Sequence, residues 1–154
     1  MAFQISRKYT IGWLHLFSNG KAITRIDFAE APMQHELPCA LLEEAHQQLH
    51  DYFGGNRQQF SLPLQPKGTQ FQRRIWELLE EIPFSETTSY QTISERYGNV
   101  KAIRAVGQAI GKNPIAIVIP CHRVIGKNGS LTGFAGGLQR KKVLLECERI
   151  KDKK

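Results

Sequence analysis

The stretch of this chain best suited to covalent chemistry is Pro120-Cys121-His122-Arg123, which follows the apolar residues 115–119. A cysteine is a strong nucleophile once its thiol is deprotonated, and a neighbouring base or cation lowers the pKa that controls this step. His122 is such a base, and Arg123 supplies a positive charge. The order of residues therefore predicts a nucleophile at the end of a buried strand. The alternative is a core cysteine with two exposed neighbours.

The sequence before this stretch favours a nucleophile that acts on nucleic acid. Asn99 is a suitable N-cap for a helix over residues 101–110, which Gly111 would end, and a shorter helix is expected from Thr88 to about residue 97. The two helices form a candidate helix-turn-helix. The small side chains of the second helix suit close packing against protein or against a DNA groove. Arg104 in its middle would fill the stack left by a flipped nucleotide, or make an ordinary phosphate contact.

Composition bounds the class of protein. The 154 residues carry a net charge of +7, which favours a polyanionic partner, although part of the excess lies in the lysine-rich residues 151–154. No apolar run approaches the roughly 20 residues that span a membrane, and the N-terminus does not read as a signal peptide. Three widely spaced cysteines indicate free thiols in a reducing compartment, so we expect a cytoplasmic protein.

The remaining pattern predicts an α/β (α+β) chain of two parts. Residues 1–66 are expected to form a small α/β domain, with a β-hairpin over 11–28 turning at Asn19-Gly20 and a helix over 39–53. A proline-containing linker at 61–68 follows. Residues 67–154 are expected to form a mostly helical, winged helix-turn-helix-like domain. Its further elements would be a helix opened by a capping box at Thr69–Gln72, a buried strand at 115–119, an Asn128-Gly129 turn and a helix at 138–149.

Residues 69–149 resemble the C-terminal domain of the O6-alkylguanine-DNA alkyltransferases. The matching segments occur in the order and spacing of that family, and they are Ser89-Tyr90-Gln91, Arg104-Ala105-Val106-Gly107, Asn113-Pro114, Ile119-Pro120-Cys121-His122-Arg123-Val124, Gly136-Gly137-Leu138 and Leu144-Leu145 followed by Glu148. Residues 1–66 resemble the small α/β domain of the family in outline only.

The resemblance implies a reaction. Cys121 would take the alkyl group from O6-alkylguanine, and from O4-alkylthymine, in double-stranded DNA, and the resulting thioether would end the working life of the protein. His122 would act as base through a water molecule, and Glu148 would orient it. Tyr90 would donate a proton to the departing base, and Asn113 would fix the turn before the active-site segment. No cofactor is implied, and we expect a monomer.

The resemblance also implies the surfaces that receive the substrate. The expected DNA contacts come from Ala102, Arg104, Ala105, Gly107, Tyr90 and Arg123, and the expected pocket is lined by Ile110, Ala116, Val124, Phe134 and Ala135. Ile103, Ala116 and Phe134 depart from residues found in some relatives, which predicts a roomier pocket that accepts bulkier alkyl groups. Some relatives bind zinc through N-terminal cysteines and histidines, but that region has only Cys39, so no metal site is expected. His46 and His50 are interpreted as an exposed polar stripe.

Two other functions fit parts of the pattern. A non-enzymatic helix-turn-helix protein or alkylation-damage sensor would use the same helices, although sensors of this kind lack the nucleophile that Cys121 provides. A Cys-His hydrolase would need an oxyanion hole, which the sequence does not specify. Taken singly, Asn113 reads as a helix C-cap and Glu148 as a surface carboxylate near Lys141 and Lys142, and a core tyrosine is an alternative for Tyr90. Taken as a matched set, these residues favour function.

Overall fold

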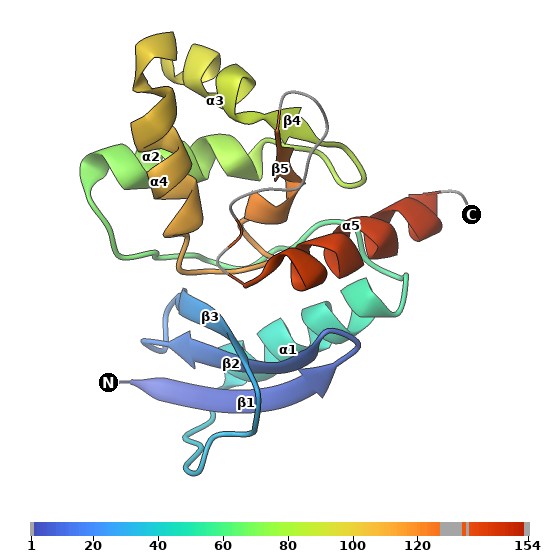
Figure 1. Ribbon diagram of the computed structural model, residues 1–154. Helices are drawn as coiled ribbons and strands as arrows, with labels where there is room; N and C mark the ends of the chain where they lie inside the picture. Colours follow the sequence, from blue (N-terminus) through green and yellow to red (C-terminus); the bar gives the residue numbers. More distant parts are fainter. Residues whose placement is uncertain (1, 127–133, 135, 153–154) are drawn as a thin grey trace. The chain divides into compact units, whose positions relative to one another are not determined.

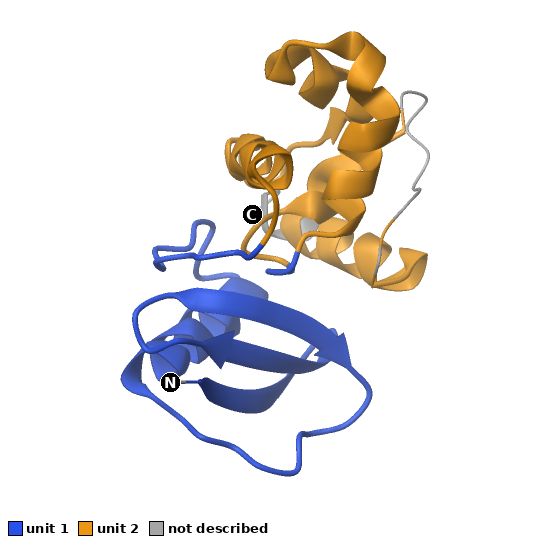
Figure 2. Cartoon of the chain, turned by 90° about the vertical axis from the view of Figure 1, so that its left-hand side faces the viewer, with its two compact units in different colours: residues 1–67, 114–116 blue, residues 68–113, 117–154 orange. Residues whose placement is uncertain are grey.

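The computed structural model describes residues 2–126, 134 and 136–152. The chain divides into two compact units, coloured separately in Figure 2. Unit 1 comprises Met1–Lys67 with 114–116, and unit 2 comprises Gly68–Asn113 with Ile117–Lys154. A sheet forms in unit 1 and helices dominate unit 2, which confirms the expected α/β class. No helix of the described residues is long and apolar enough to cross a bilayer.

Unit 1 is built on a three-stranded antiparallel sheet of β1 (Phe3–Tyr9), β2 (Gly12–Ser18) and β3 (Ile23–Ala29), in that order. The predicted hairpin is confirmed as β2 and β3. Its turn is stabilised by the Asn19 side-chain oxygen, which accepts hydrogen bonds from the N–H groups of Lys21 and Ala22, while Gly20 adopts a φ of 92°. Strand β1 was not predicted, and it pairs with β2 along its whole length.

One helix, α1 (Ala40–Phe53), packs against this sheet (Figure 1). It confirms the helix predicted over residues 39–53 and ends at Gly54. Its buried residues include Leu42, Ala45, Leu49 and Tyr52, which recur at helical spacing. The core of unit 1 therefore lies between this stripe and the buried side chains of the strands.

The strand predicted at residues 115–119 is not formed, and that prediction is wrong. The segment makes only a single bridge, in which the Ile26 N–H donates to the Pro114 carbonyl and the Ala116 N–H donates to the Ile26 carbonyl. Ile117 then turns the chain with a φ of 73°, which excludes extended backbone and is rare for a β-branched residue. A short apolar run indicates burial but does not distinguish a strand from a buried turn.

Unit 2 contains four α-helices among its described residues, α2 (Gln70–Glu80), α3 (Tyr90–Tyr97), α4 (Ile103–Gly111) and α5 (Leu138–Asp152). The capping box predicted at Thr69 and Gln72 is present. Helices α3 and α4 pack on each other and on α2 (Figure 1). The turn between them contains Gly98, with a φ of 103°, and the short 3-10 helix η1 (Val100–Ala102), so the predicted second helix begins two residues later than expected.

Trp76 links α2 to the helix that leads toward the cysteine. Its ring is buried, and its Nε1–H donates a 2.8 Å hydrogen bond to the carbonyl of Ala109 in α4. Gly68 lies against this ring, since a Cβ added there would come within 2.5 Å of Trp76 Cη2. Glycine at this position therefore permits the packing that holds α4 in place.

We predict that Gly68→Ala destabilises the protein by about 1–3 kcal/mol, because the added methyl group overpacks a site closed by an indole ring. Urea unfolding followed by tryptophan fluorescence measures this loss. Gly111→Ala is the matched control, because a Cβ there meets nothing within 4 Å. It should be neutral or stabilise by up to about 1 kcal/mol. Equal stability of the two variants would contradict the prediction.

Candidate active site

Cys121 opens a 3-10 turn that two short strands hold beside α3. The turn η2 (Cys121–Arg123) leads directly into β5 (Val124–Ile125), which pairs in parallel with β4 (Thr88–Ser89). Tyr90 follows β4 as the first residue of α3. The pairing of Thr88 with Val124 therefore brings the beginning of α3 and the Cys121 turn together.

The Cys121 thiol is buried, with 9% of the residue exposed. Burial raises the pKa of this thiol, because a thiolate is poorly solvated there. A hydrogen bond from the Asn113 side chain and the positive charge of Lys141 act in the opposite direction without cancelling the effect. The Asn113 amide also donates to the carbonyl of Ile119, at 2.8 Å. Cys121 is therefore a protonated thiol at neutral pH, placed beside groups that favour its ionised form.

His122 is fully buried and lies against Glu148, with 2.6 Å between Nε2 and Oε2. Burial lowers the pKa of this imidazole more than Glu148 raises it, so the ring is neutral at neutral pH. We assign the proton to Nε2, because the carboxylate can only accept there. Nδ1 then carries a lone pair. Among the described residues, it is the one buried side-chain nitrogen or oxygen without a hydrogen-bond partner. His122 can thus accept a proton at Nδ1.

Glu148 is shared between the histidine and an arginine. The Nε of Arg123 donates to Oε1 at 2.9 Å and its Nη2 donates to Oε2 at 3.0 Å, while the Ser85 N–H donates to Oε1 at 3.2 Å. Burial alone would raise the pKa of Glu148. The hydrogen bonds and charges of His122 and Arg123 instead hold it well below its usual range. Glu148 is therefore a carboxylate, and its charge is already compensated by Arg123.

Arg123 is not placed to contact DNA, contrary to the expectation from the sequence. Only 6% of the residue is exposed, and its Nη1 donates a 2.7 Å hydrogen bond to the carbonyl of Ile82. Its guanidinium also lies 5.8 Å from the centre of the Phe84 ring. With its donors directed at Glu148 and Ile82, the side chain fixes the active-site turn from inside the protein.

Lys141 belongs to the site, although no role was expected for it from the sequence. It is 1% exposed, and its Nζ donates to the carbonyl of Val124. Burial lowers the pKa of Lys141, and the Cys121 thiolate would raise it. The spacing of Lys141, Leu145 and Glu148 along the last helix was the available signal, because it places both charged residues on the stripe that carries the buried leucines.

The residues expected to contact DNA differ in their exposure. Arg104 and Ala105 are exposed on α4, and Ala102 is half-buried at its beginning. Ile103 is 42% exposed between them. Gly107 instead faces α3, since a Cβ there would lie 3.8 Å from Cδ1 of Tyr90. The structure therefore gives Gly107 a packing role under Tyr90.

The expected pocket residues are only partly brought together. Val124 and Ile110 are buried in unit 2, and Phe134 is half-buried. Ala116 belongs to unit 1, where its N–H is bonded to Ile26. Ala135 and the Asn128-Gly129 turn lie outside the described residues.

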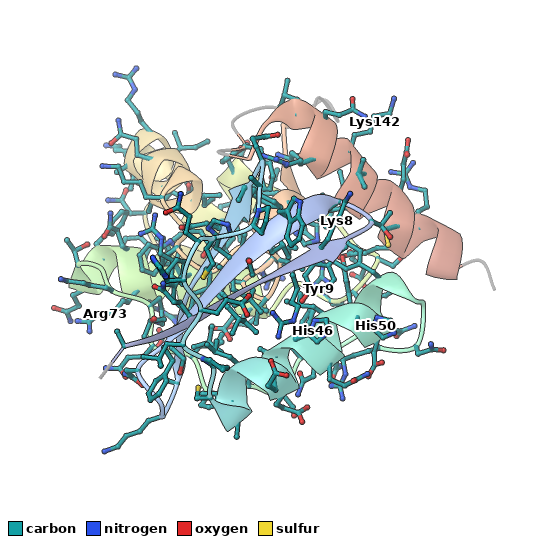
Figure 3. The ribbon with its side chains drawn as sticks, turned by 90° about the horizontal axis from the view of Figure 1, so that it is seen from below. Lys8, Tyr9, His46, His50, Arg73 and Lys142 are labelled. Carbon is teal, nitrogen blue, oxygen red and sulfur yellow. The ribbon has the colours of Figure 1, made fainter. Side chains whose placement is uncertain are left out.

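His46 of α1 is half-buried and has a protein partner, whereas His50 is exposed, so the expected exposed stripe applies to His50 alone. The hydroxyl of Tyr9 lies 2.7 Å from Nδ1 of His46, and His50 is one turn further along the helix (Figure 3). No group of three or more histidine, cysteine, aspartate or glutamate residues that could hold a metal occurs in the described part of the chain.

We predict that Glu148→Gln destabilises the protein by about 3–5 kcal/mol, because it leaves the Arg123 guanidinium buried without a carboxylate. Urea unfolding at neutral pH measures the loss. Glu146→Gln on the same helix is the control, because Glu146 is exposed and should change stability by less than about 0.5 kcal/mol. A similar, small effect of both substitutions would show that the buried cluster does not stabilise the fold.

Comparisons with known proteins agree over both units. The family model described as 6-O-methylguanine DNA methyltransferase, DNA binding domain, matches residues 70–150. A second family model, described as 6-O-methylguanine DNA methyltransferase, ribonuclease-like domain, matches residues 7–66. The methylated-DNA–protein-cysteine methyltransferase of Haemophilus influenzae is 45% identical over 149 residues, covering 91% of this chain and 82% of the relative.

Solved structures give the same result. The O6-methylguanine methyltransferase of Mycobacterium tuberculosis matches with a TM-score of 0.88 and 41% identity, covering 98% of this chain and 94% of that one. The Mycobacterium tuberculosis OGT in complex with DNA matches with a TM-score of 0.87 and 42% identity, covering 95% and 92% of the two chains. With family matches to both parts of the chain and this similarity over nearly its whole length, the chain belongs to the family of O6-methylguanine-DNA methyltransferases.

Proposed function

We propose that this protein repairs DNA by transferring the alkyl group of O6-alkylguanine, and of O4-alkylthymine, to its own Cys121. The observation that carries the proposal is the Cys121 turn, in which a buried thiol stands next in the chain to a neutral histidine. That histidine donates to Glu148 and keeps a free lone pair at Nδ1. The arrangement supplies a nucleophile, a base and a group that orients the base.

The reaction is a direct displacement at the alkyl carbon. The thiol proton passes to Nδ1 of His122, through a water molecule as the family resemblance implies, and the Sγ electron pair forms the new S–C bond. The C–O6 bond breaks, and its electron pair leaves with the guanine. Tyr90 would donate a proton to the leaving base at this point, and the proton held by His122 is given up to solvent, from which the Tyr90 phenol is restored. The products are an S-alkylcysteine and an unmodified guanine.

The product explains why the protein would react once. A thioether carbon is not activated toward water, unlike the carbonyl of a thioester, so Cys121 cannot be regenerated by hydrolysis at a useful rate. Each molecule therefore removes one alkyl group, and repair capacity equals the number of protein molecules.

The helices α3 and α4 would present the damaged base to Cys121. A base inside a duplex must be flipped out before its O6 substituent can reach a buried thiol. Arg104 is exposed on α4, where it can enter the vacated stack. We infer that the protein does this as a monomer on double-stranded DNA.

We predict that a duplex containing labelled O6-methylguanine transfers its label to the protein up to one equivalent, and that peptide mass spectrometry finds the methyl group on Cys121. Cys121→Ala should abolish transfer while leaving binding to undamaged duplex unchanged, since the small substitution preserves the buried turn. Cys147→Ala is the control and should transfer normally. Binding without transfer in the wild-type protein would support a damage sensor, and transfer by Cys121→Ala would refute the mechanism.

A pH dependence follows from the raised pKa of Cys121. The thiolate forms only above the ordinary pKa range of cysteine, so transfer from the free base O6-benzylguanine should still rise with pH on the alkaline side. Lys141→Gln should move the midpoint of Cys121 ionisation to higher pH, because it removes a cation that favours the thiolate. Thiolate absorbance near 240 nm in a Cys39→Ser, Cys147→Ser background measures the midpoint.

Lys142→Gln controls for the loss of a nearby charge, since Lys142 is exposed on the same helix. It should leave the Cys121 midpoint unchanged. A midpoint for Lys141→Gln that equals the wild-type value would show that the buried ammonium does not act on the thiol.

A further inference from the structure

A polar groove lies on unit 2 between the exposed face of α2 and the end of α3. It has a volume of about 650 Å³, and its lining residues are Gln70, Phe71, Arg73, Arg74, Glu77 and Tyr97. None of these residues takes part in the Cys121 site described above. The groove is open to solvent along α2, because most of its lining side chains are exposed.

The apolar part of the groove is an aromatic pair. The rings of Phe71 and Tyr97 pack edge to face, with centroids 5.1 Å apart and an interplanar angle of 87°. Tyr97 is nevertheless 37% exposed, although it is a large side chain at the end of a helix. The pair thus joins α2 to α3 and leaves the Tyr97 side chain partly exposed at the groove.

The charged part of the groove is dominated by two consecutive arginines. Arg74 has 51% of its side chain exposed and makes a long ion pair of 3.5 Å with Glu77, whose side chain is 65% exposed. Arg73 is exposed as well, and its side chain has no hydrogen bond or ion pair to another described residue. Figure 3 shows Arg73 on α2 and Lys142 on α5. A guanidinium that is exposed and uncompensated is suited to bind a phosphate group.

The groove continues into the turn of the helix-turn-helix. Tyr97 is the last residue of α3, and the chain continues through Gly98 and Asn99 into η1, which begins at Val100, and then into α4. All three are exposed, Val100 by 53%. The groove therefore adjoins, along the chain, the segment that is expected to contact the duplex.

We propose that this groove binds the phosphate backbone of duplex DNA next to the base pairs held by α3 and α4. The proposal rests on the proposed DNA repair function and extends its contact surface to α2. Arg73 would make the main phosphate contact. Arg74 would exchange its weak pairing with Glu77 for a second phosphate, and the Tyr97 hydroxyl would donate to the same backbone. Phosphate contacts of this kind position a protein on DNA without reading sequence.

The test is the salt dependence of binding to an undamaged duplex. The logarithm of the binding constant K falls linearly with the logarithm of the salt concentration. Each phosphate contact that is lost makes this slope less steep by about 0.9, which corresponds to about eightfold weaker binding at 0.1 M salt. We expect this change for Arg73→Ala and a larger one for Arg73→Ala combined with Arg74→Ala. Lys142→Ala removes an exposed cation of unit 2 outside the groove and should keep the wild-type slope, so an equal loss in this control would overturn the proposal.

A second measurement separates the groove from the reaction. Transfer from the free base O6-benzylguanine should be unchanged in the arginine variants, because neither arginine contacts Cys121 or its partners, and the melting temperature should stay within a few degrees. An unchanged slope in the double variant overturns the groove proposal even if alkyl transfer is normal. A wild-type protein that binds DNA but transfers nothing refutes the proposed function. In that case the salt dependence of the double variant still tests the groove proposal by itself.

Discussion

The active site depends on one buried carboxylate. Glu148 is almost completely removed from solvent, and an uncompensated carboxylate in that position would cost several kcal/mol. Arg123, His122 and the Ser85 N–H together satisfy it. These three donors come from the turn that carries Cys121 and from the loop after α2, while the acceptor comes from α5. Satisfying this carboxylate therefore fixes three separate parts of unit 2 around the cysteine.

The same network determines how charge develops during the reaction. Arg123 already compensates Glu148, so His122 remains neutral and is available as a base. In the proposed reaction the proton passes from the thiol to His122, so a negative charge would appear near Lys141 and a positive charge beside Glu148. Both charges thus arise where an opposite charge is already held in place. Preorganisation of this kind lowers the barrier without requiring solvent to reorganise at the moment of transfer.

The sequence predicted elements whose signals are local. The Asn19-Gly20 hairpin, the Thr69 capping box and the helix at the C-terminal end are each specified by residues a few positions apart. Strand β1 was missed because the polar residues Ser6, Arg7 and Lys8 interrupt its apolar content. The turn at Ile117 was missed because apolar character predicts burial and carries no information on the sign of φ.

The sequence predicted most of the residues that form the site but not all of the hydrogen bonds between them. The residues themselves indicated Cys121 and His122, and similarity to a known family added Glu148. The structure brings His122 and Glu148 within hydrogen-bonding distance. The partner of Arg123 could not be predicted from the sequence, because an arginine beside a cysteine can bind either a phosphate or a buried carboxylate. Only the fold places Glu148, 25 positions away along the chain, against its guanidinium. The spacing of Lys141 along the buried stripe of α5 was a signal for its burial, but only the fold shows that its ammonium lies at the carbonyl of Val124.

The raised pKa of Cys121 suits a nucleophile that is used once. A resting thiolate would react with any small electrophile that reached it, and each such event would remove one molecule from repair. A buried thiol reacts slowly until a base takes its proton, and His122 is the base in the proposed reaction. In the proposed reaction the alkylated base is aligned against Cys121 when the proton moves, so the oriented substrate gains rate that a freely diffusing electrophile does not. The burial that makes the thiol a poor nucleophile at rest therefore gives the site its selectivity for alkyl groups on bound DNA.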